Sequence, residues 1–323
     1  MMQIVLIGLG AGAASAFLFA SVASGAPLSL ILANFAQLPI LLAAIGWTHY
    51  AGLVAVLIAS AGLAVILGAW VSFAFLIGIG LPAWWIGYLA LLARPAPGAA
   101  ADVEWYPVGR IVVWTAIGAS VIVIVSIIRY GLDADSVKAG LRRELDLAAR
   151  FLTGFRVPGF RDPDQLKDAL VLIVPGMKAI ALTFTSLINL WLAALIVKIS
   201  GRLRRPWPPI AQMSFPPFAP KVFAGAVAAT FLPELLGLMG GVFVASLLLA
   251  YALLGFAVVH SITLGVAGRG LMLTGLYFIV MLFSWPLLLV MSVLGLVETM
   301  LALRARVAAR RRPPPPPGSI NRR

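Results

Sequence analysis

The sequence predicts an all-α polytopic transmembrane helix bundle, with about eight to nine spans and one amphipathic interfacial helix. Hydrophobic residues make up 62% of the 323 residues and charged residues only 11%, against averages of about 45–50% and about 25% in soluble domains. The mean hydropathy of +1.05 agrees with this. A chain of this composition has the lipid bilayer as its solvent, and its length allows several spans of about 20 residues each.

Nine apolar runs follow one another along the chain. The boundaries of the first four are the weakest, because Gly46, Trp70 and Pro82 allow one span to be short, tilted or re-entrant. Eight spans are therefore an alternative to nine. The runs cover residues 3–24, 28–46, 51–70, 71–93, 109–130, 169–197, 221–240, 242–266 and 271–297.

The first run reads as a transmembrane helix rather than a cleaved signal peptide, because it has no positive n-region and is longer than a typical h-region. Gly8, Gly12, Ala16 and Ala20 recur on it every four positions. Such a face lets another helix approach closely. Packing within the bundle is one use for it, and docking of a membrane protein partner is the other.

Residues 131–168 form the only substantial polar segment between spans. Val137, Leu141 and Leu145 share one side of a helix, while Lys138 and Arg142 fall largely on the other. This pattern is typical of a helix on the membrane surface that contacts anionic lipid headgroups, although a solvated helix packed on the domain would look similar. The next helix should begin at a capping box formed by Asp162, Pro163 and Gln165.

We expect an integral membrane domain over residues 1–303 and a basic, proline-rich, disordered tail over residues 304–323. The net charge of +13 comes from connectors and from this tail, which favours contact with lipid headgroups over nucleic acid. The positive-inside rule places residues 131–168 and the C-terminus in the cytoplasm. This leaves the basic connector with Arg202, Arg204 and Arg205 outside, which conflicts with the same rule.

The residues argue against catalysis and against a cofactor. The chain has no cysteine and two histidines, which makes a structural metal site a poor interpretation. Membrane-embedded enzymes need paired carboxylates, a metal or an activated nucleophile. Glu234 is the lone acidic candidate in the apolar runs, so we expect no enzyme, no metal and no cofactor.

One face of the sixth run carries the candidate ligand site. Lys178, Thr185 and Asn189 are spaced seven and four apart, which brings them within about 20° of one another on a helix. A lysine in the bilayer needs water or a partner, so this face could line a site for a small anionic or zwitterionic ligand. The alternative is interhelical hydrogen bonding, with Lys178 near the interface. Asn34 and Gln37 on the second run form a smaller patch with the same two readings.

His260 and Arg269 are the remaining candidates. Gly265, Gly268 and Gly270 predict a tight turn between the last two runs, with Arg269 at the headgroup level. His260 lies on the helix before this turn, about 9 Å along the helix from Val266. A histidine bonded to a neighbouring side chain is one reading, and a ligand or proton carrier that titrates near neutral pH is the other.

Several stretches resemble the YybS-like family of predicted bacterial membrane proteins. They are the early "LPILLAAIGW" and "GLPAWWIGYLALLAR", then "VPGMKAIALTFTSLINLWLA", "RLRRPWPP", "HSITLGVAGRG", Tyr277, Pro286 and "LGLVETMLALR". The resemblance covers most of the chain. Glu298 stands where that family commonly has Asp, and the aromatic residue that usually follows is missing.

The resemblance implies a multi-pass protein of the bacterial inner (cytoplasmic) membrane. The early helices of that family are similar to the substrate-binding subunits of energy-coupling-factor transporters, which implies a transporter-like subunit that holds a small molecule. In such a subunit the small-residue face of the first helix would dock the coupling partner. The alternative function is a non-catalytic membrane interaction or assembly protein.

Overall fold

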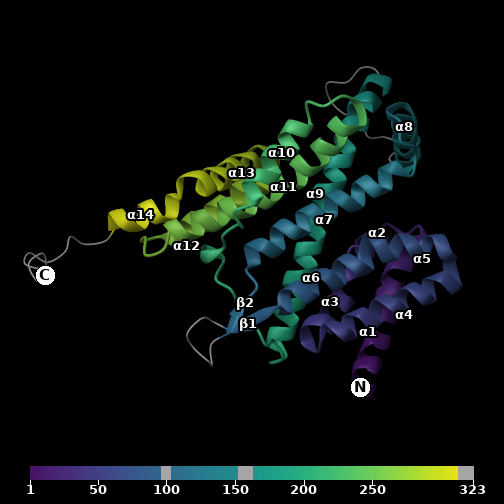
Figure 1. Cartoon of the computed structure of the whole chain (residues 1–323), viewed down its shortest axis with the longest axis horizontal. Helices are drawn as coiled ribbons and strands as arrows, with labels where there is room; N and C mark the ends of the chain where they lie inside the picture. The colour runs from purple at the N-terminus through teal and green to yellow at the C-terminus, as the bar shows by residue number, and fades with distance from the viewer. Residues whose placement is uncertain (96–102, 152–162, 312–323) are drawn as a thin grey trace, which may run out of the picture. The chain divides into compact units, whose positions relative to one another are not determined.

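The structure, a computed structural model, describes residues 1–95, 103–151 and 163–311 (Figure 1). It is helical almost throughout, which confirms the all-α class. The chain divides into two compact units. The first consists of Met1–Trp207 and Pro216–Leu249, and the second of Pro208–Phe215 and Ala250–Arg323.

Fourteen α-helices and two short strands make up the described part of the chain. Short 3₁₀ turns cover Ser21–Ser24 and Ile210–Gln212, and a π-helical turn covers Leu76–Gly80. The strands are β1 (Ala93–Pro95) and β2 (Val103–Trp105). The helices are α1 (Met2–Ala20), α2 (Pro27–Ala33), α3 (Gln37–Gly46), α4 (His49–Leu67), α5 (Ala69–Phe75), α6 (Leu81–Leu91), α7 (Val108–Ile128), α8 (Ala134–Phe151), α9 (Pro163–Ile199), α10 (Ala219–Ala229), α11 (Glu234–Ile262), α12 (Arg269–Leu282), α13 (Ser284–Leu301) and α14 (Leu303–Arg311).

Seven helical segments of the described chain are long and apolar enough to cross a membrane, or eight if α13 and α14 count as one span bent by 72°. The sequence predicts about eight to nine. The difference comes from the last third of the chain, where the runs at 221–240 and 271–297 are not continuous helices. α9 begins at Pro163 as expected, whereas Asp162 of the predicted capping box lies outside the described residues.

The predicted span at 221–240 is wrong, because the chain turns back within it. α10 has 11 residues, which is about 16 Å of helix and too short to cross about 30 Å of hydrocarbon. Pro233 cannot continue a helix, and Glu234 after it has φ 55°. Gly240 of α11 lies close to the end of α10, since a Cβ added there would be 2.7 Å from the backbone N of Thr230.

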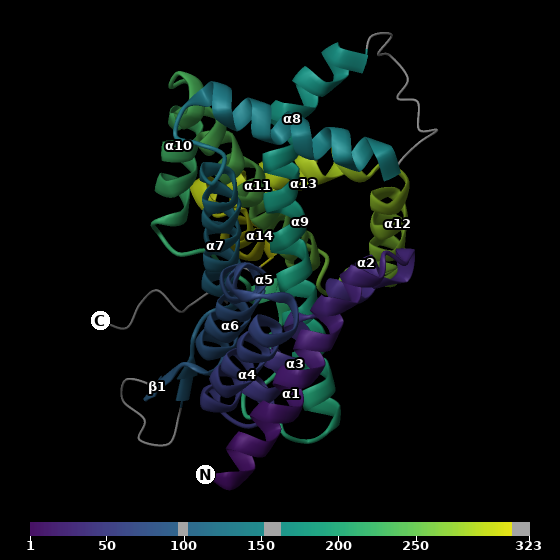
Figure 2. The same ribbon diagram turned by 90° about the vertical axis from the view of Figure 1, so that its right-hand side faces the viewer.

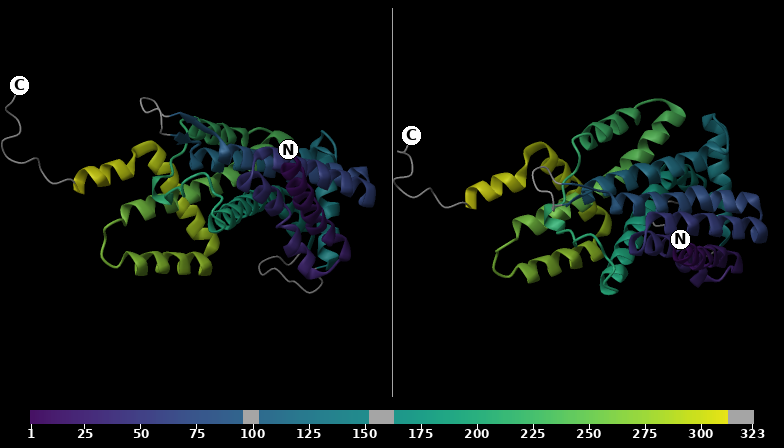
Figure 3. Two further views of the ribbon diagram at one scale, coloured as in Figure 1. Left: turned by 90° about the horizontal axis from the view of Figure 1, so that it is seen from below. Right: turned by 60° about the horizontal axis from the view of Figure 1, so that its bottom comes forward.

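The predicted span at 271–297 is also divided. Phe283, with φ −122° and ψ 52°, separates α12 from α13, and the two helices meet at a bend (Figure 3). The proline at position 286 explains the break, because a proline has no N–H to donate and clashes with the carbonyl four residues earlier. The predicted disordered tail starts too early, since residues 303–311 form α14. Residues 312–323 of that tail lie outside the described residues.

Close helix contacts organise the first unit. A Cβ at Gly8 would lie 2.5 Å from Cγ1 of Val54, and one at Gly12 would lie 2.6 Å from the carbonyl oxygen of Ala55. The small-residue face of α1 therefore packs on α4 within the chain, which is the first of its two predicted uses. A partner protein could reach only the other sides of α1.

Helix α8 crosses the end of α7 and the N-terminal half of α9 rather than lying alongside them (Figure 2). Val137 and Leu141 of its apolar stripe are buried against Val123 and Ile127 of α7 and Val171 of α9. Its polar side carries ion pairs to α9, including Lys167 with Asp146 at 2.9 Å. The predicted amphipathic helix thus exists, and its apolar stripe packs on protein.

Candidate functional site

The second span is interrupted near its middle. Over Pro27–Gly46, α2 ends at Ala33 and α3 begins at Gln37. In between, the backbone amides of Asn34, Phe35 and Ala36 bond to carbonyls three residues back, which is a 3₁₀ arrangement. Short 3₁₀ stretches inside a helix often mark a functional hinge.

Polar side chains from two other helices converge on this interruption. The Ser15 hydroxyl of α1 is buried and donates to the carbonyl oxygen of Ala36 at 2.6 Å. On α9, Asn189 Nδ2 donates to the carbonyl oxygen of Asn34 at 2.8 Å, and the Thr185 hydroxyl lies 3.5 Å from Asn34 Oδ1. The structure therefore brings Asn34 of one predicted polar patch together with Thr185 and Asn189 of the other.

Gln37 is the first residue of α3 and follows directly on the interruption. Contacts join Asn34 to Thr185 and Gly46 to Val197, and both pairs are 151 residues apart in sequence. The shared offset means that this part of the second span and α9 run parallel. Gly46 faces α9, whereas Gln37, nine residues earlier, lies on the opposite side of α3 at 3.6 residues per turn. Gln37 is 3% exposed and Asn189 is 1% exposed.

Two buried acceptor atoms next to the interruption lack a partner among the described residues. They are Asn189 Oδ1 and Gln37 Oε1, and both are inaccessible to solvent. The orientation of the Asn189 amide follows from its surroundings, because Nδ2 faces the carbonyl oxygens of both Asn34 and Thr185 at 2.8 Å and must therefore be the donor. A buried polar atom without a hydrogen bond costs about 1–3 kcal/mol, so a ligand or water that donates to these oxygens would be stabilised here.

Lys178 belongs to a different cluster, at the α8 end of α9. Its ammonium donates to Glu144 of α8, which also accepts from the Tyr130 hydroxyl and pairs with Arg129 at 2.8 Å. Burial alone would raise the pKa of Glu144, but the hydrogen bonds from Lys178 and Tyr130 and the two positive charges lower it. Burial and the bond to Glu144 raise the pKa of Tyr130. The Lys178 charge is thus neutralised by a carboxylate of α8.

His260 and Arg269 lie in the second unit. His260 Nε2 is 2.8 Å from the Tyr277 hydroxyl, which matches the reading of a histidine bonded to a neighbour. Gly265 and Gly268 both have φ 76°, as the predicted tight turn requires. The buried Nε of Arg269 has no hydrogen-bond partner in the part of the chain that is described.

An ion pair between Glu298 and Arg304, which the sequence did not indicate, stabilises the bend between α13 and α14. Glu298 is 9% exposed, and its carboxylate accepts from Arg304 Nε at 2.7 Å and from the Arg304 backbone N at 3.1 Å. Arg304 Nη1 also donates to the carbonyls of Ala211 and Met213. Ala302 stands at the bend with φ 47°. The pair, six residues apart, could not be inferred without this bend.

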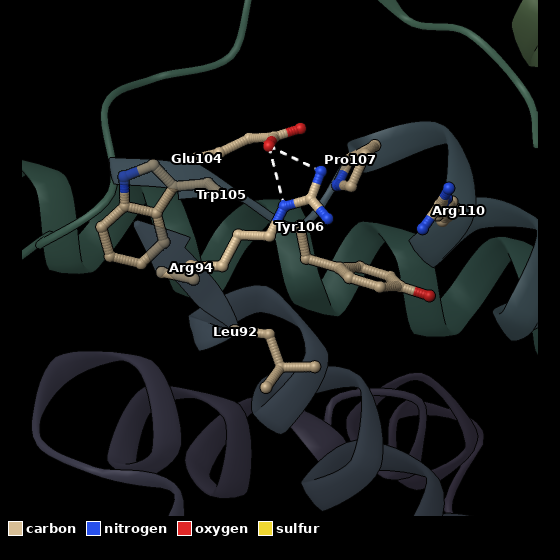
Figure 4. Close-up of a pocket in the computed structure, with 8 residues that line it drawn as sticks. Leu92, Arg94, Glu104, Trp105, Tyr106, Pro107 and Arg110 are labelled. Carbon is tan, nitrogen blue, oxygen red and sulfur yellow. Dashed lines mark hydrogen bonds and ion pairs between the residues drawn. The ribbon is translucent and has the colours of Figure 1, made fainter. Parts of the chain in front are cut away.

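A second group of residues that the sequence did not indicate lies in the connection between α6 and α7. β1 and β2 pair antiparallel, with Arg94 opposite Glu104, and the two side chains are 2.8 Å apart. They line a cavity of about 320 Å³ together with Tyr106 and Arg110 (Figure 4). The Arg110 guanidinium carbon lies 5.8 Å from the centre of the Tyr106 ring.

Residues 13–299 match the family described as "Predicted membrane protein (DUF2232)". The chain belongs to this family. Neither a curated protein nor a solved structure matches the chain significantly. Membership of DUF2232 confirms the expectation of a family of predicted membrane proteins over most of the chain. The YybS-like name and the similarity to energy-coupling-factor subunits remain predictions.

Proposed function

We propose that the protein is a transporter-like membrane protein that binds a small polar solute where the second span is interrupted. The observation that carries this proposal is the pair of buried, unpartnered acceptors, Asn189 Oδ1 and Gln37 Oε1, at the level of the 3₁₀ interruption. Many transporters bind their substrate near the bilayer midplane, where a discontinuous helix meets its neighbours. The predicted similarity to substrate-binding subunits points in the same direction, as a fold-level analogy.

The chemistry of the free atoms favours a ligand that donates hydrogen bonds. An amide oxygen accepts hydrogen bonds and can coordinate a cation, but it cannot donate. The solute would therefore be an amine, an ammonium, a polyol or a monovalent cation. An anionic ligand is less favoured than the sequence suggests, because the ammonium of Lys178 is paired with Glu144. The alternative function, a membrane interaction or assembly protein without a ligand, leaves the two acceptors unexplained.

Native mass spectrometry of the gently solubilised chain tests for a copurifying solute. Thermal unfolding should then be followed with sodium chloride, ammonium chloride and a panel of primary amines and polyols. A ligand at about 100 times its Kd stabilises its protein by about 2.7 kcal/mol, so a binding probe should raise the Tm measurably.

Two variants, Gln37→Met and Asn189→Leu, remove the acceptors while roughly keeping side-chain volume, and both should abolish the stabilisation by the probe. Thr183→Val is the matched control. Thr183 is buried on the same helix as Asn189, and its hydroxyl donates to the Ala179 carbonyl at 2.7 Å. The proposal fails if no probe or copurified solute binds, or if all three variants respond as the unmodified chain does. Protein partners that copurify equally with every variant would instead favour the assembly function.

A further inference from the structure

Two hollows lie beside α6, α7 and the connection between them. The first is the cavity of about 320 Å³ at the β1–β2 connection, with Arg94, Glu104 and Arg110 in its wall. The second, of about 340 Å³, is lined almost entirely by apolar side chains of α6, α7 and α9, with Trp85, Trp114 and Gly118 among them. On α7, Arg110 of the first hollow precedes Trp114 of the second by four residues, which is about one helical turn or 6 Å.

A hydrogen bond joins the two hollows. The Trp114 indole Nε1 in the wall of the apolar groove donates to the hydroxyl of Tyr106 in the wall of the polar cavity, at 3.1 Å. Trp and Tyr side chains that present an apolar body and a polar tip are typical of the membrane interface. This bond thus links the wall of the polar cavity to the wall of the apolar groove.

The polar hollow carries net positive charge. Arg94 is paired with Glu104, whereas Arg110 forms no ion pair that the structure records over the ranges it describes, and its guanidinium is exposed. Arg110 is the third residue of α7, which begins at Val108. It therefore lies at the depth where a span meets the headgroup region, and arginine there matches the geometry of a phosphate.

We propose that the cavity and the groove together are a binding site for an anionic phospholipid. The phosphate would contact Arg110, with Arg94 beside it, and one acyl chain would lie along the groove past Trp114 and Gly118. A soluble anion would use the cavity alone and would leave the groove without a function. Because the site is separate from the interrupted second span, the inference does not depend on the proposed solute-binding function.

The test measures retention of lipid by the purified full chain. The detergent-solubilised protein is stripped of lipid, incubated with dioleoyl phosphatidylglycerol or dioleoyl phosphatidylcholine, and examined by native mass spectrometry. We expect one tightly held phosphatidylglycerol per chain. Loss of a charge-assisted contact in Arg110→Gln should weaken retention on the order of tenfold. Arg143→Gln on α8, whose side chain donates to the Ala139 carbonyl of its own helix, should retain lipid normally.

A second pair of variants tests the acyl-chain groove. A Cβ at Gly118, which lines the groove, would have no neighbour within 4 Å, so Gly118→Leu places its side chain in the groove. It should reduce phosphatidylglycerol retention, whereas Gly62→Leu, at an equally open glycine of α4, should not. Equal retention by all variants would overturn the proposal, as would equal retention of the two lipids. Binding of inorganic phosphate that Arg110→Gln abolishes and Gly118→Leu leaves unchanged, without lipid retention, would show an anion site instead.

Discussion

Asn189 Nδ2 donates to the backbone carbonyl oxygen of Asn34 at 2.8 Å. This bond attaches α9 to the second span at the point where the second span is interrupted. It also points Asn189 Oδ1 away from the two carbonyl oxygens that accept from Nδ2 and leaves Oδ1 unpartnered among the described residues. A single side chain therefore supports the interruption and contributes to the candidate site.

Asn189→Asp should destabilise the protein strongly. The substitution keeps the side chain's shape but replaces the Nδ2 donor by an oxygen that faces the carbonyls of Asn34 and Thr185, both at 2.8 Å from Nδ2. Burying an unpaired polar or charged group costs at least about 1–3 kcal/mol, so we expect a lower Tm in detergent. Thr183→Val is the control, because Thr183 is buried on the same helix as Asn189 and its hydroxyl donates to the Ala179 carbonyl of that helix. An equal loss in both variants would contradict the role given to Asn189.

The attachment of α8 through Glu144 should depend on pH. The pKa of Glu144 is lowered in the folded state, so its contribution to stability is present above the ordinary glutamate pKa of about 4.3 and is lost as the pH falls through the lower native value. Because the group is partly exposed, we expect about 1 kcal/mol or less. Unfolding of the unmodified chain and of Glu144→Gln should differ at pH 7, and the difference should shrink toward pH 3. A difference that grows at low pH would reverse the sign and refute this account.

Gly12→Ile should disrupt the contact between α1 and α4. Even a Cβ at Gly12 would lie 2.6 Å from the Ala55 carbonyl oxygen, and overpacking of this kind costs about 1–3 kcal/mol or more. Gly10→Ile on the same helix is the control, since a Cβ there has no neighbour within 4 Å. Thermal unfolding in detergent should show a lower Tm for Gly12→Ile alone. Equal Tm values would mean that the two helices do not pack as described.

The orientation of the last helices can be measured by single-cysteine labelling, because the chain contains no cysteine. We predict a cytoplasmic C-terminus and the turn with Arg269 on the opposite side. In intact bacterial cells an impermeant maleimide should label Gly268→Cys but not Ser319→Cys. The reverse pattern would invert the orientation. Labelling of both positions, or of neither, would mean that an even number of crossings separates them.

Composition and hydrophobic pattern determined the membrane class, the helical fold and the amphipathic helix, because a bilayer requires every backbone group of a span to bond within its own helix. Those requirements are local and can be read from about 20 residues at a time. The breaks at Phe283 and within 221–240 were harder to predict, since a proline near a helix end is compatible with either a bend or a continuous span.

The partners of each polar side chain were decided by the tertiary structure alone. Helical periodicity placed Lys178, Thr185 and Asn189 on one face, yet Lys178 pairs with Glu144, 34 residues away, while Asn189 contacts Asn34, 155 residues away. An apolar helix surface looks the same in sequence whether it faces lipid or another helix, since both are apolar environments. Which faces meet, and therefore which buried oxygens are left for a ligand, depends on how the helices pack.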